Sequence, residues 1–176
     1  MNTIKKHKWS IVLGLVLIGM FIYDVNIGSN ALNLTLSNIK TMLSILPPIF
    51  IIIGLLDVWV PKETMIKYMG QNSGFQGVCI AFLLGSVAAG PLYAAFPIAA
   101  ILMKKGARFA YILFFLGVWS SAKVPHMIFE YTSFGGKFTF YHILSSLIIY
   151  LVGSMLIEKL LSEESINSIY AKSETI

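Results

Sequence analysis

An apolar segment interrupted by Gly-Pro constrains this chain more than any other feature. From Gly85 to Met103 the sequence carries no charged residue, and two lysines follow directly. Gly90-Pro91 and Pro97 are expected to break a helix there, because proline lacks the N–H that a helix needs and clashes with the preceding turn. A break leaves backbone groups that hydrocarbon cannot satisfy, so it persists only where protein or water covers it. The segment is therefore either a packing kink in a membrane helix or the broken helix of a transporter binding site.

The composition indicates a membrane protein. Hydrophobic residues make up 57% of the 176 residues and charged residues 12%, whereas a soluble domain carries about 25% charged residues. We expect an all-α integral membrane protein, with one transmembrane domain over residues 1–157 and a charged cytoplasmic tail over residues 158–176. The basic residues flank apolar segments, as membrane anchoring requires, so the net charge of +5 does not indicate a nucleic-acid partner. A single cysteine, Cys79, excludes an internal disulfide and a cysteine-built metal site.

Four apolar runs are expected to span the bilayer, and polar connections separate them. The residues from Asp24 to Asn38 form one connection, and those from Pro61 to Gly74 form another. Pro47 and Pro48 should kink the second span. A signal peptide is an alternative for the first run, with Ser29 and Ala31 as small residues near a cleavage site. The four runs are Trp9–Tyr23, Thr41–Val60, Ala107–Phe129 and Phe138–Ile157.

The broken segment Phe75–Met103 decides the topology. As one straight helix it would be about 43 Å long, too long for a hydrocarbon core of about 30 Å, and each half is too short to span. If the segment crosses, there are five spans, and the basic residues other than Lys123 divide six against six. If it re-enters, ten lie inside and two outside, which the positive-inside rule favours. We therefore predict four spans plus a re-entrant hairpin, with both termini cytoplasmic. The balanced alternative would suit an antiparallel, dual-orientation homodimer.

Ionisable residues inside a membrane segment are costly and are functional candidates. Lys123, His126 and Glu130 are spaced to share one helical face, where they could bind an anion or relay protons. Alternatively, Lys123 snorkels, and His126 and Glu130 lie at the interface. Asp57, near Pro61, is a further relay candidate that could equally be interfacial. His142 is expected at the interface, at the start of the last span.

The two proline breaks have similar surroundings. Phe82-Leu-Leu-Gly85 precedes Pro91, and Phe114-Phe-Leu-Gly117 precedes Pro125. This order would suit two broken helices that face one site, although chance also explains it in so apolar a chain.

Several motifs together resemble a known family. The run from Gly90 to Gly106, followed by Phe115-Leu-Gly117 and Lys123-Val-Pro125, is similar to the predicted permease family that includes bacterial organoarsenical efflux permeases. The stretch Leu46–Pro61 is also similar, and the resemblance covers roughly residues 43–140. Members are commonly built of two related halves, and this chain resembles one half. The resemblance therefore implies a homodimer, or pairing with a second half-size permease, with the site at the interface.

One departure from that family concerns the substrate. The arsenical-exporting members of that family look to have cysteines in the broken-helix motif. The corresponding stretch of this chain is Gly90-Pro91-Leu92-Tyr93, which contains no cysteine. Thiolate chemistry is therefore not expected here, and the arsenical substrate is not carried over. Lys123 and its neighbouring serines suggest a polar or anionic solute instead.

The sequence thus predicts a homodimeric permease of the cell membrane that works by alternating access, with no cofactor or metal. Rival hypotheses are a non-transporting subunit that assembles with another permease half, and a channel. An enzyme is not expected, because no catalytic constellation occurs. The residues predicted to line the path are Gly90, Pro91, Tyr93, Pro97, Ser120, Ser121, Lys123 and Pro125.

Overall fold

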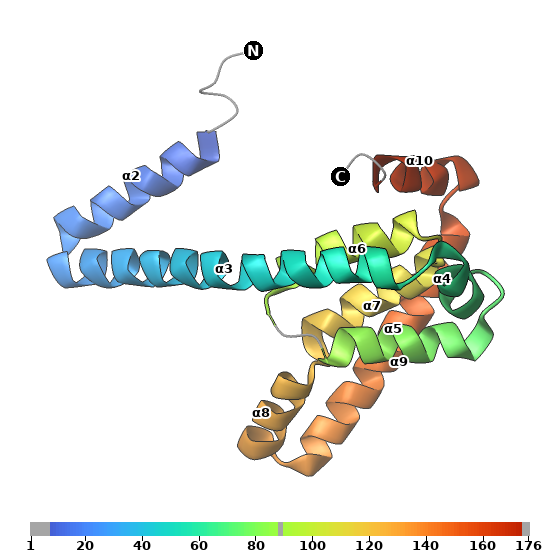
Figure 1. Cartoon of the computed structure of the whole chain (residues 1–176). Coiled ribbons are helices and arrows are strands. Elements are labelled where there is room, and N and C mark those ends of the chain that lie inside the picture. The colour runs from blue at the N-terminus through green and yellow to red at the C-terminus, as the bar shows by residue number, and fades with distance from the viewer. Residues whose placement is uncertain (1–7, 88–89, 174–176) are drawn as a thin grey trace. The chain divides into compact units, whose positions relative to one another are not determined.

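A computed structural model of the chain describes residues 8–87 and 90–173 (Figure 1). The side chains of Leu46, Ile53, Leu56 and Asp57 lie outside this description, and so does the relay role expected of Asp57. The described backbone is helical, as the composition predicts. The chain divides into two compact units, residues 1–48 and residues 49–176.

The first unit contains α2 (Lys8–Tyr23) and the beginning of α3 (Val25–Trp59). Asp24 separates these helices, and its Oδ1 accepts hydrogen bonds from the backbone N–H groups of Asn26 (2.7 Å) and Ile27 (3.3 Å). A carboxylate in this position satisfies N–H groups that have no partner inside the helix. Because of this cap, α3 begins at Val25.

The polar connection predicted over Asp24–Asn38 is therefore wrong, since nearly all of it is helical. Hydroxyl groups in this part of α3 bond back to carbonyls one turn earlier, as Thr35 does to Ala31 (2.8 Å) and Thr41 to Ser37 (2.9 Å). Such bonds let polar side chains lie on a helix without competing for its backbone donors. The helix continues through Pro47 and Pro48, and the boundary between the two units falls directly after Pro48.

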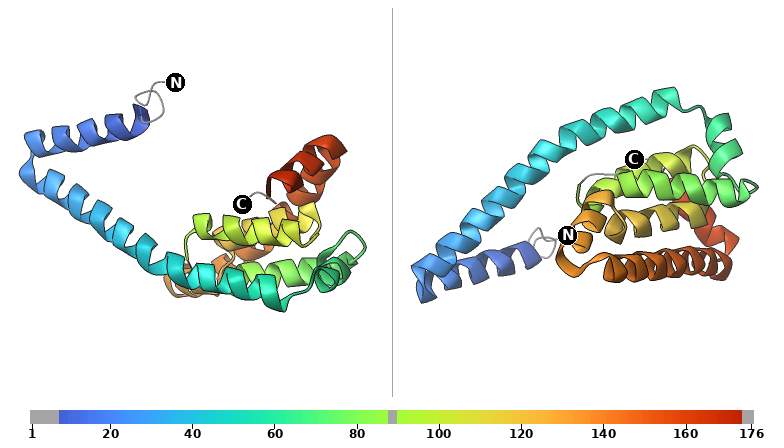
Figure 2. Two further views of the ribbon diagram at one scale, coloured as in Figure 1. Left: turned by 45° about the horizontal axis from the view of Figure 1, so that its top comes forward. Right: turned by 90° about the horizontal axis from the view of Figure 1, so that it is seen from below.

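The second unit is a helical bundle built around α7 (Phe109–Ser121). This helix packs against α5 (Gly74–Val87), α6 (Ala95–Lys104) and α9 (Gly136–Leu160), as Figure 2 also shows. Most of its side chains are buried by protein alone, including Tyr111, Phe115 and Val118. A helix that is apolar all round belongs in such a central position.

Glycines set the closest approaches in this bundle. A Cβ atom on Gly85 of α5 would lie 2.8 Å from Val118 and 2.9 Å from the carbonyl oxygen of Phe115. A Cβ atom on Gly117 would lie 2.6 Å from the ring of Tyr150 in α9. Small residues allow helix backbones to pack closely in membranes, where no hydrophobic effect drives helices together.

The predicted broken segment is broken in the structure. Helix α5 ends at Val87, and after Gly90-Pro91 a short 3₁₀ helix, η1 (Leu92–Ala94), leads into α6. The break expected at Pro97 is wrong, because Pro97 lies in the first turn of α6. Backbone N–H groups in a first turn have no partner within the helix, so proline costs little there.

Both outer ends of this segment lie at one end of α7, which we call the basic end. Before α5, the short helix α4 (Lys62–Met69) presents the Met69 carbonyl to the Arg108 N–H, at 2.7 Å. After α6, the buried Lys105 side chain donates to the Val60 carbonyl at 2.7 Å. The basic end is formed by residues 60–74, 104–110 and 158–170. The chain therefore enters along α5 and returns along α6, as in the predicted hairpin.

The C-terminal end of α6 explains why the chain can turn there. The N–H of Gly106 bonds to the Met103 carbonyl (2.8 Å), and the N–H of Ala107 bonds to the Leu102 carbonyl (2.9 Å). This pair of bonds closes a helix end when the residue after the cap is left-handed, and Gly106 has a φ of +83°. The Lys-Gly pair of the sequence is thus a helix stop.

The span that was expected over Ala107–Phe129 consists of two helices. Helix α7 ends at Ser121, α8 (Val124–Phe134) follows, and the two are bent by 41°. Helix α9 follows the turn at Gly135, and α10 (Glu163–Ser173) packs against α6. Within the described chain, Val25–Ile52 and Gly136–Leu160 are long and apolar enough to cross a membrane, and α7 with α8 makes a third if the bent pair is one span. Together with the shorter apolar helices, this supports an all-α membrane protein.

Candidate translocation site

The two helix breaks of the second unit lie in contact with each other. The Nζ atom of Lys123 donates to the Gly90 carbonyl at 2.8 Å. The indole Nε1 of Trp119 donates to the Pro91 carbonyl at 3.3 Å, and Trp119 is 3% exposed. The Gly90 and Pro91 carbonyl groups at the first break are therefore satisfied by side chains of the second, as a lipid environment requires.

Local sequence explains the second break. Pro125 occupies the second position of α8, where its missing N–H costs no helical bond. Proline disfavours helical geometry in the residue before it, but Val124 is already the first residue of α8, and the extended residue is Lys123, with a ψ of 145°. Lys123 is thus an extended residue between two helices, and its side chain is directed to Gly90.

Lys123 lies between two helix ends with opposite dipoles. It follows the C-terminal end of α7, whose dipole favours a positive charge, and it is the N-cap of α8, whose dipole disfavours one. The Gly90 carbonyl, just beyond the end of α5, stabilises the Lys123 ammonium group by accepting its hydrogen bond. Since α7 has 13 residues, the break lies about 20 Å from the basic end. This distance is shorter than the thickness of a hydrocarbon core, which is about 30 Å.

The structure brings together only some of the residues predicted for the path. Gly90, Pro91 and Lys123 meet at the break, and Trp119 joins them although the sequence analysis did not select it. A buried indole usually finds an acceptor for its N–H. The position of Trp119 between Gly117 and Lys123 is therefore the feature of the sequence that could have indicated its role. We call Gly90, Pro91, Trp119 and Lys123 the break cluster.

The other predicted residues lie around the break cluster without a described bond to it. Tyr93 lies in η1 and is 37% exposed, and Pro125 is exposed. The Ser120 hydroxyl bonds back to its own helix at the Gly117 carbonyl, at 2.7 Å. The Ser121 hydroxyl donates to the Tyr150 hydroxyl of α9, at 3.1 Å. Ser121 therefore ties the end of α7 to α9.

Lys123, His126 and Glu130 do not act as one group. Glu130 is buried, with an exposed fraction of 6%, and its carboxylate contacts Nδ1 of His142 in α9, at 2.9 and 3.0 Å from its two oxygens. His126 is exposed, and no bond of its side chain is described. The periodicity placed the three residues on one face, but it could not show that α9 supplies the partner of Glu130.

At the basic end, an ion pair joins α7 to α9. Arg108 donates to Glu158 Oε2 through Nε (2.8 Å) and Nη2 (2.6 Å), and the Ala110 N–H donates to Oε1 (3.1 Å). The hydrogen bond with Glu158 raises the pKa of Arg108 above its ordinary value, against a smaller opposing effect of burial. This pair fixes one end of the bundle while the break cluster lies further along α7.

The C-terminal helix is attached at the same end. The Tyr170 hydroxyl donates to the Ala107 carbonyl at 2.6 Å, and its ring lies 6.5 Å from that of Phe109. Burial, with a smaller contribution from the charge of Glu158, raises the pKa of Tyr170 to about 12. Residues 163–173 are therefore a docked helix.

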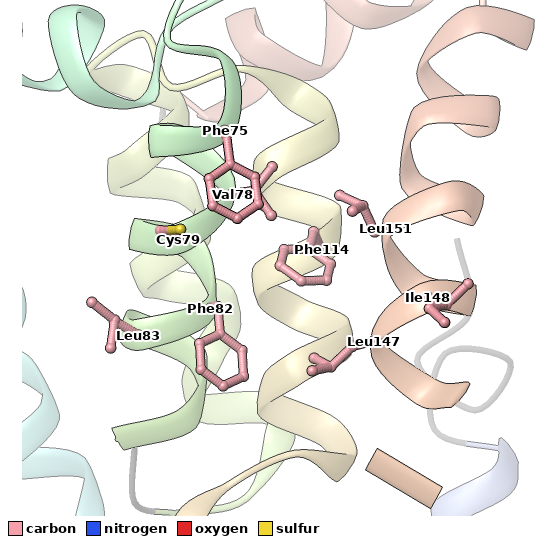
Figure 3. A pocket seen from close by; sticks show the side chains of 9 residues that line it. All are labelled: Phe75, Val78, Cys79, Phe82, Leu83, Phe114, Leu147, Ile148 and Leu151. Carbon is pink, nitrogen blue, oxygen red and sulfur yellow. The ribbon is translucent and has the colours of Figure 1, made fainter. Parts of the chain in front are cut away.

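An apolar pocket opens between α5, α7 and α9, as Figure 3 shows. Its volume is about 420 Å³, and Cys79 is the only lining residue with a heteroatom in its side chain. Across residues 8–87 and 90–173, no group of three or more His, Cys, Asp or Glu side chains could hold a metal ion. The lining residues are Phe75, Val78, Cys79, Phe82, Leu83, Phe114, Leu147, Ile148 and Leu151.

Comparisons with known proteins agree with these features at the level of the family. No curated protein and no solved structure was found to match the chain. Residues 28–175 match the sequence description of a family whose members are predicted permeases. That match includes both helix breaks, all of α4 to α10 and most of α3. The chain, a multi-pass membrane protein of the transporter type rather than a recognisable enzyme, therefore belongs to the predicted permease family.

Proposed function

We propose that this chain is a permease subunit of the cell membrane that exports a small polar, anionic or metalloid solute through the break cluster. The observation that carries this proposal is the hydrogen bond between Lys123 and the Gly90 carbonyl. It joins two interrupted helices at a depth where an ammonium group and free carbonyl groups are both expensive. Such a cost is retained where the groups serve a function.

The break cluster offers a solute both kinds of polar partner. The Lys123 ammonium group has three N–H donors, of which one faces Gly90. An anionic or strongly polar solute would be held by this ammonium group. When Lys123 turns to the solute, the Gly90 carbonyl becomes available to a donor on the solute. Lys123 therefore exchanges an internal acceptor for an external one as the solute binds.

The connections of the two breaks to the rest of the bundle support alternating access. The bonds of Arg108 and Tyr170 hold the basic end together, whereas α8 follows α7 after the Ala122–Lys123 link, with a bend of 41° between the two helices, and packs against α9. Rotation at that link would move Lys123 relative to Gly90 and open the break cluster to one side or the other. Discontinuous helices at a repeat interface support this kind of gating.

We also propose that two copies of the chain assemble, with the solute path at or near their interface. The chain contains one pair of broken helices, whereas the resemblance described above implies two related halves. A second, different half-size permease would meet the same need. Cross-linking and mass measurement of the protein in lipid nanodiscs distinguish two identical copies from a mixed pair.

The test of solute binding uses purified protein in nanodiscs and a thermal-shift screen. The panel contains oxyanions, metalloids with and without methyl groups, amino acids and thiols. A ligand present at about 100 times its dissociation constant stabilises the folded state by about 2.7 kcal/mol. We expect one solute class to raise the midpoint of unfolding in a saturable way, and the same solute to exchange across proteoliposome membranes.

Lys123→Gln is the informative variant, because glutamine keeps a donor for the Gly90 carbonyl and removes the charge. We expect it to unfold cooperatively but to bind the solute at least about tenfold more weakly, a loss of about 1.4 kcal/mol. Lys137→Gln, at an exposed position in the first turn of α9, is the matched control and should bind as the wild type does. Unchanged binding in Lys123→Gln would contradict the site. Failure of every solute to bind would instead favour a non-transporting subunit.

A further inference from the structure

Glu130 and His142 form a second ionisable site away from the break cluster, with a buried carboxylate and an imidazole side chain that is 37% exposed. Glu130 lies in α8 and is 6% exposed, and both carboxylate oxygens are within hydrogen-bond distance of His142 Nδ1, at 2.9 and 3.0 Å. When the Glu130 carboxylate is ionised it is only an acceptor, and Nδ1 then carries the hydrogen of this bond. The ring nitrogen that remains to gain or lose a proton is Nε2.

The surroundings of the pair are apolar and fix the imidazole ring. Phe138, one turn earlier in α9, stacks on His142 with centroids 5.8 Å apart and planes inclined by 22°. Phe134 of α8 lies against Phe138, with ring centroids 5.0 Å apart and planes inclined by 49°. The ring of His142 is therefore held in place between a carboxylate and an aromatic face.

A purely structural role explains this pair poorly. Helices α8 and α9 already pack together along their length, and apolar side chains would join them at lower cost. Replacing a buried ion pair by apolar residues is often neutral or stabilising. Ionisable residues in membrane segments more often mark proton or ion pathways.

Other titratable groups near the pair do not replace it. Within the described chain, α7, which packs against α9, contributes only Tyr111, whose hydroxyl donates to the Gly74 carbonyl at the basic end. Tyr150 of α9 accepts from Ser121, and Glu158 binds Arg108. The remaining titratable groups of α8 and α9 are exposed: His126, Tyr131, Lys137, Tyr141 and Lys159.

We infer that Glu130 and His142 form the proton-binding site that couples solute movement at the break cluster to the pH difference across the membrane. With the proton bound at Nε2, the imidazolium and the carboxylate form an ion pair. When the proton leaves, a neutral imidazole remains hydrogen-bonded to the carboxylate. Histidine suits this role because its charge changes near physiological pH.

Helix α8 links the two sites mechanically. Lys123 directly precedes α8 and Glu130 lies in its second turn, seven residues further on, which is about 10 Å along the helix axis. The helix is bounded by the Ala122–Lys123 link and by Gly135, which has a φ of +84°. The strength of the contact between Glu130 and α9 therefore affects the position of α8. Because Lys123 directly precedes α8, a movement of this helix also moves Lys123 toward or away from Gly90.

The first experiment measures proton binding without any solute. Imidazole ¹⁵N signals of histidine-labelled protein in nanodiscs are followed from about pH 5 to about pH 9, with His142→Asn to assign the signal. We expect His142 to gain and lose a proton in this interval, and its transition to move in Glu130→Gln. A His142 ring that stays in one protonation state throughout would overturn the inference.

The second experiment rests on the proposed function and separates coupling from transport. A solute identified in the screen is exchanged across proteoliposomes, first at equal pH and then with a pH difference of about one unit, which supplies up to about a tenfold accumulation per coupled proton. For the wild type, we expect exchange in both settings and accumulation only with the pH difference.

Three variants then test whether the pair of Glu130 and His142 couples proton movement to solute accumulation. Glu130→Gln and His142→Asn should exchange the solute at equal pH but fail to accumulate it, whereas His126→Asn, on the exposed face of α8, should accumulate it as the wild type does. Accumulation that persists in both pair variants, or that is lost in His126→Asn, would overturn the inference. Absence of exchange in the wild type would instead refute the proposed function, and the ¹⁵N titration still judges the proton site on its own.

Discussion

At the scale of single residues, charged and polar side chains in this protein act mainly by supplying partners to backbone groups. Lys123 binds the Gly90 carbonyl, Trp119 the Pro91 carbonyl and Lys105 the Val60 carbonyl. Each of these carbonyls lies outside a helix or at its end. In a low-dielectric surrounding, an unpaired backbone group costs several kcal/mol, so such side chains determine where the helices can be interrupted.

Tyr170 provides a prediction at the same scale. Its folded-state pKa of about 12 lies above the ordinary tyrosine pKa of about 10, so the neutral phenol is the form that the docked helix α10 favours. The stabilisation is fully present below about pH 10 and is lost as the pH rises through about 12. The phenolate also cannot donate to the Ala107 carbonyl.

Ultraviolet absorbance of the phenolate, followed with rising pH, measures this transition. We expect Tyr170→Phe to remove one tyrosine from the part of the titration that lies above pH 11 and to weaken the docking of α10. Tyr141→Phe, at a position that is 68% exposed, serves as the control and should leave that part unchanged. An identical high-pH titration in both variants would show that Tyr170 is not buried against α7.

At the scale of helices, the packing of α5 on α7 depends on a small residue at Gly85. An alanine Cβ there would approach the Phe115 carbonyl oxygen to 2.9 Å, and a backbone atom cannot move aside as the end of a flexible side chain can. Overpacking of this kind typically costs about 1 to 3 kcal/mol. We therefore expect Gly85→Ala to lower the free energy of unfolding by an amount in this range.

Gly153→Ala is the matched control, because Gly153 is also helical but a Cβ there meets nothing within 4 Å. Alanine has the higher helix propensity, by about 1 kcal/mol, so this variant should be neutral or slightly more stable. Unfolding in mixed micelles with increasing denaturing detergent compares the two variants. Equal stability of both would mean that α5 can withdraw from α7 without loss.

At the scale of the whole molecule, the sequence predicted the class and the breaks better than the contacts. Composition and proline chemistry are local, so the helical membrane fold and the interruption at Gly90-Pro91 followed from them. Pro97 was misjudged because a proline breaks a helix only where an N–H is needed, and that depends on where α6 begins. The helix over Asp24–Asn38 was missed because its polar side chains bond to their own backbone.

The partners of the functional residues could not be predicted, because they come from distant parts of the chain. Glu130 meets His142 across the α8–α9 turn, and Arg108 meets Glu158, which is 50 residues away. Helical periodicity reports which residues share a face, but not which helix lies against that face. Trp119 and the partner of Lys123 became evident only once the two breaks were placed together.

The arrangement of α5 and α6 leads to a prediction about the membrane topology. Both ends of this segment lie at the basic end, so a membrane-embedded α5–α6 pair enters and leaves on one side. The alternative of five spans requires residues 72 and 104 to lie on opposite sides. Single cysteines introduced as Asn72→Cys, Lys104→Cys and Lys137→Cys in a Cys79→Ser background distinguish the two.

A charged, membrane-impermeant thiol reagent is applied to right-side-out and to inverted vesicles. We expect Asn72→Cys and Lys104→Cys to be labelled only in inverted vesicles, because the clustered basic residues favour the cytoplasmic side. Lys137→Cys, near the turn between α8 and α9, should be labelled only in right-side-out vesicles. Labelling of Asn72→Cys and Lys104→Cys from opposite sides would refute the hairpin. In that case residues 75–103 would form a continuous span, and the chain would not return to the basic end along α6. The two breaks could then no longer lie next to each other.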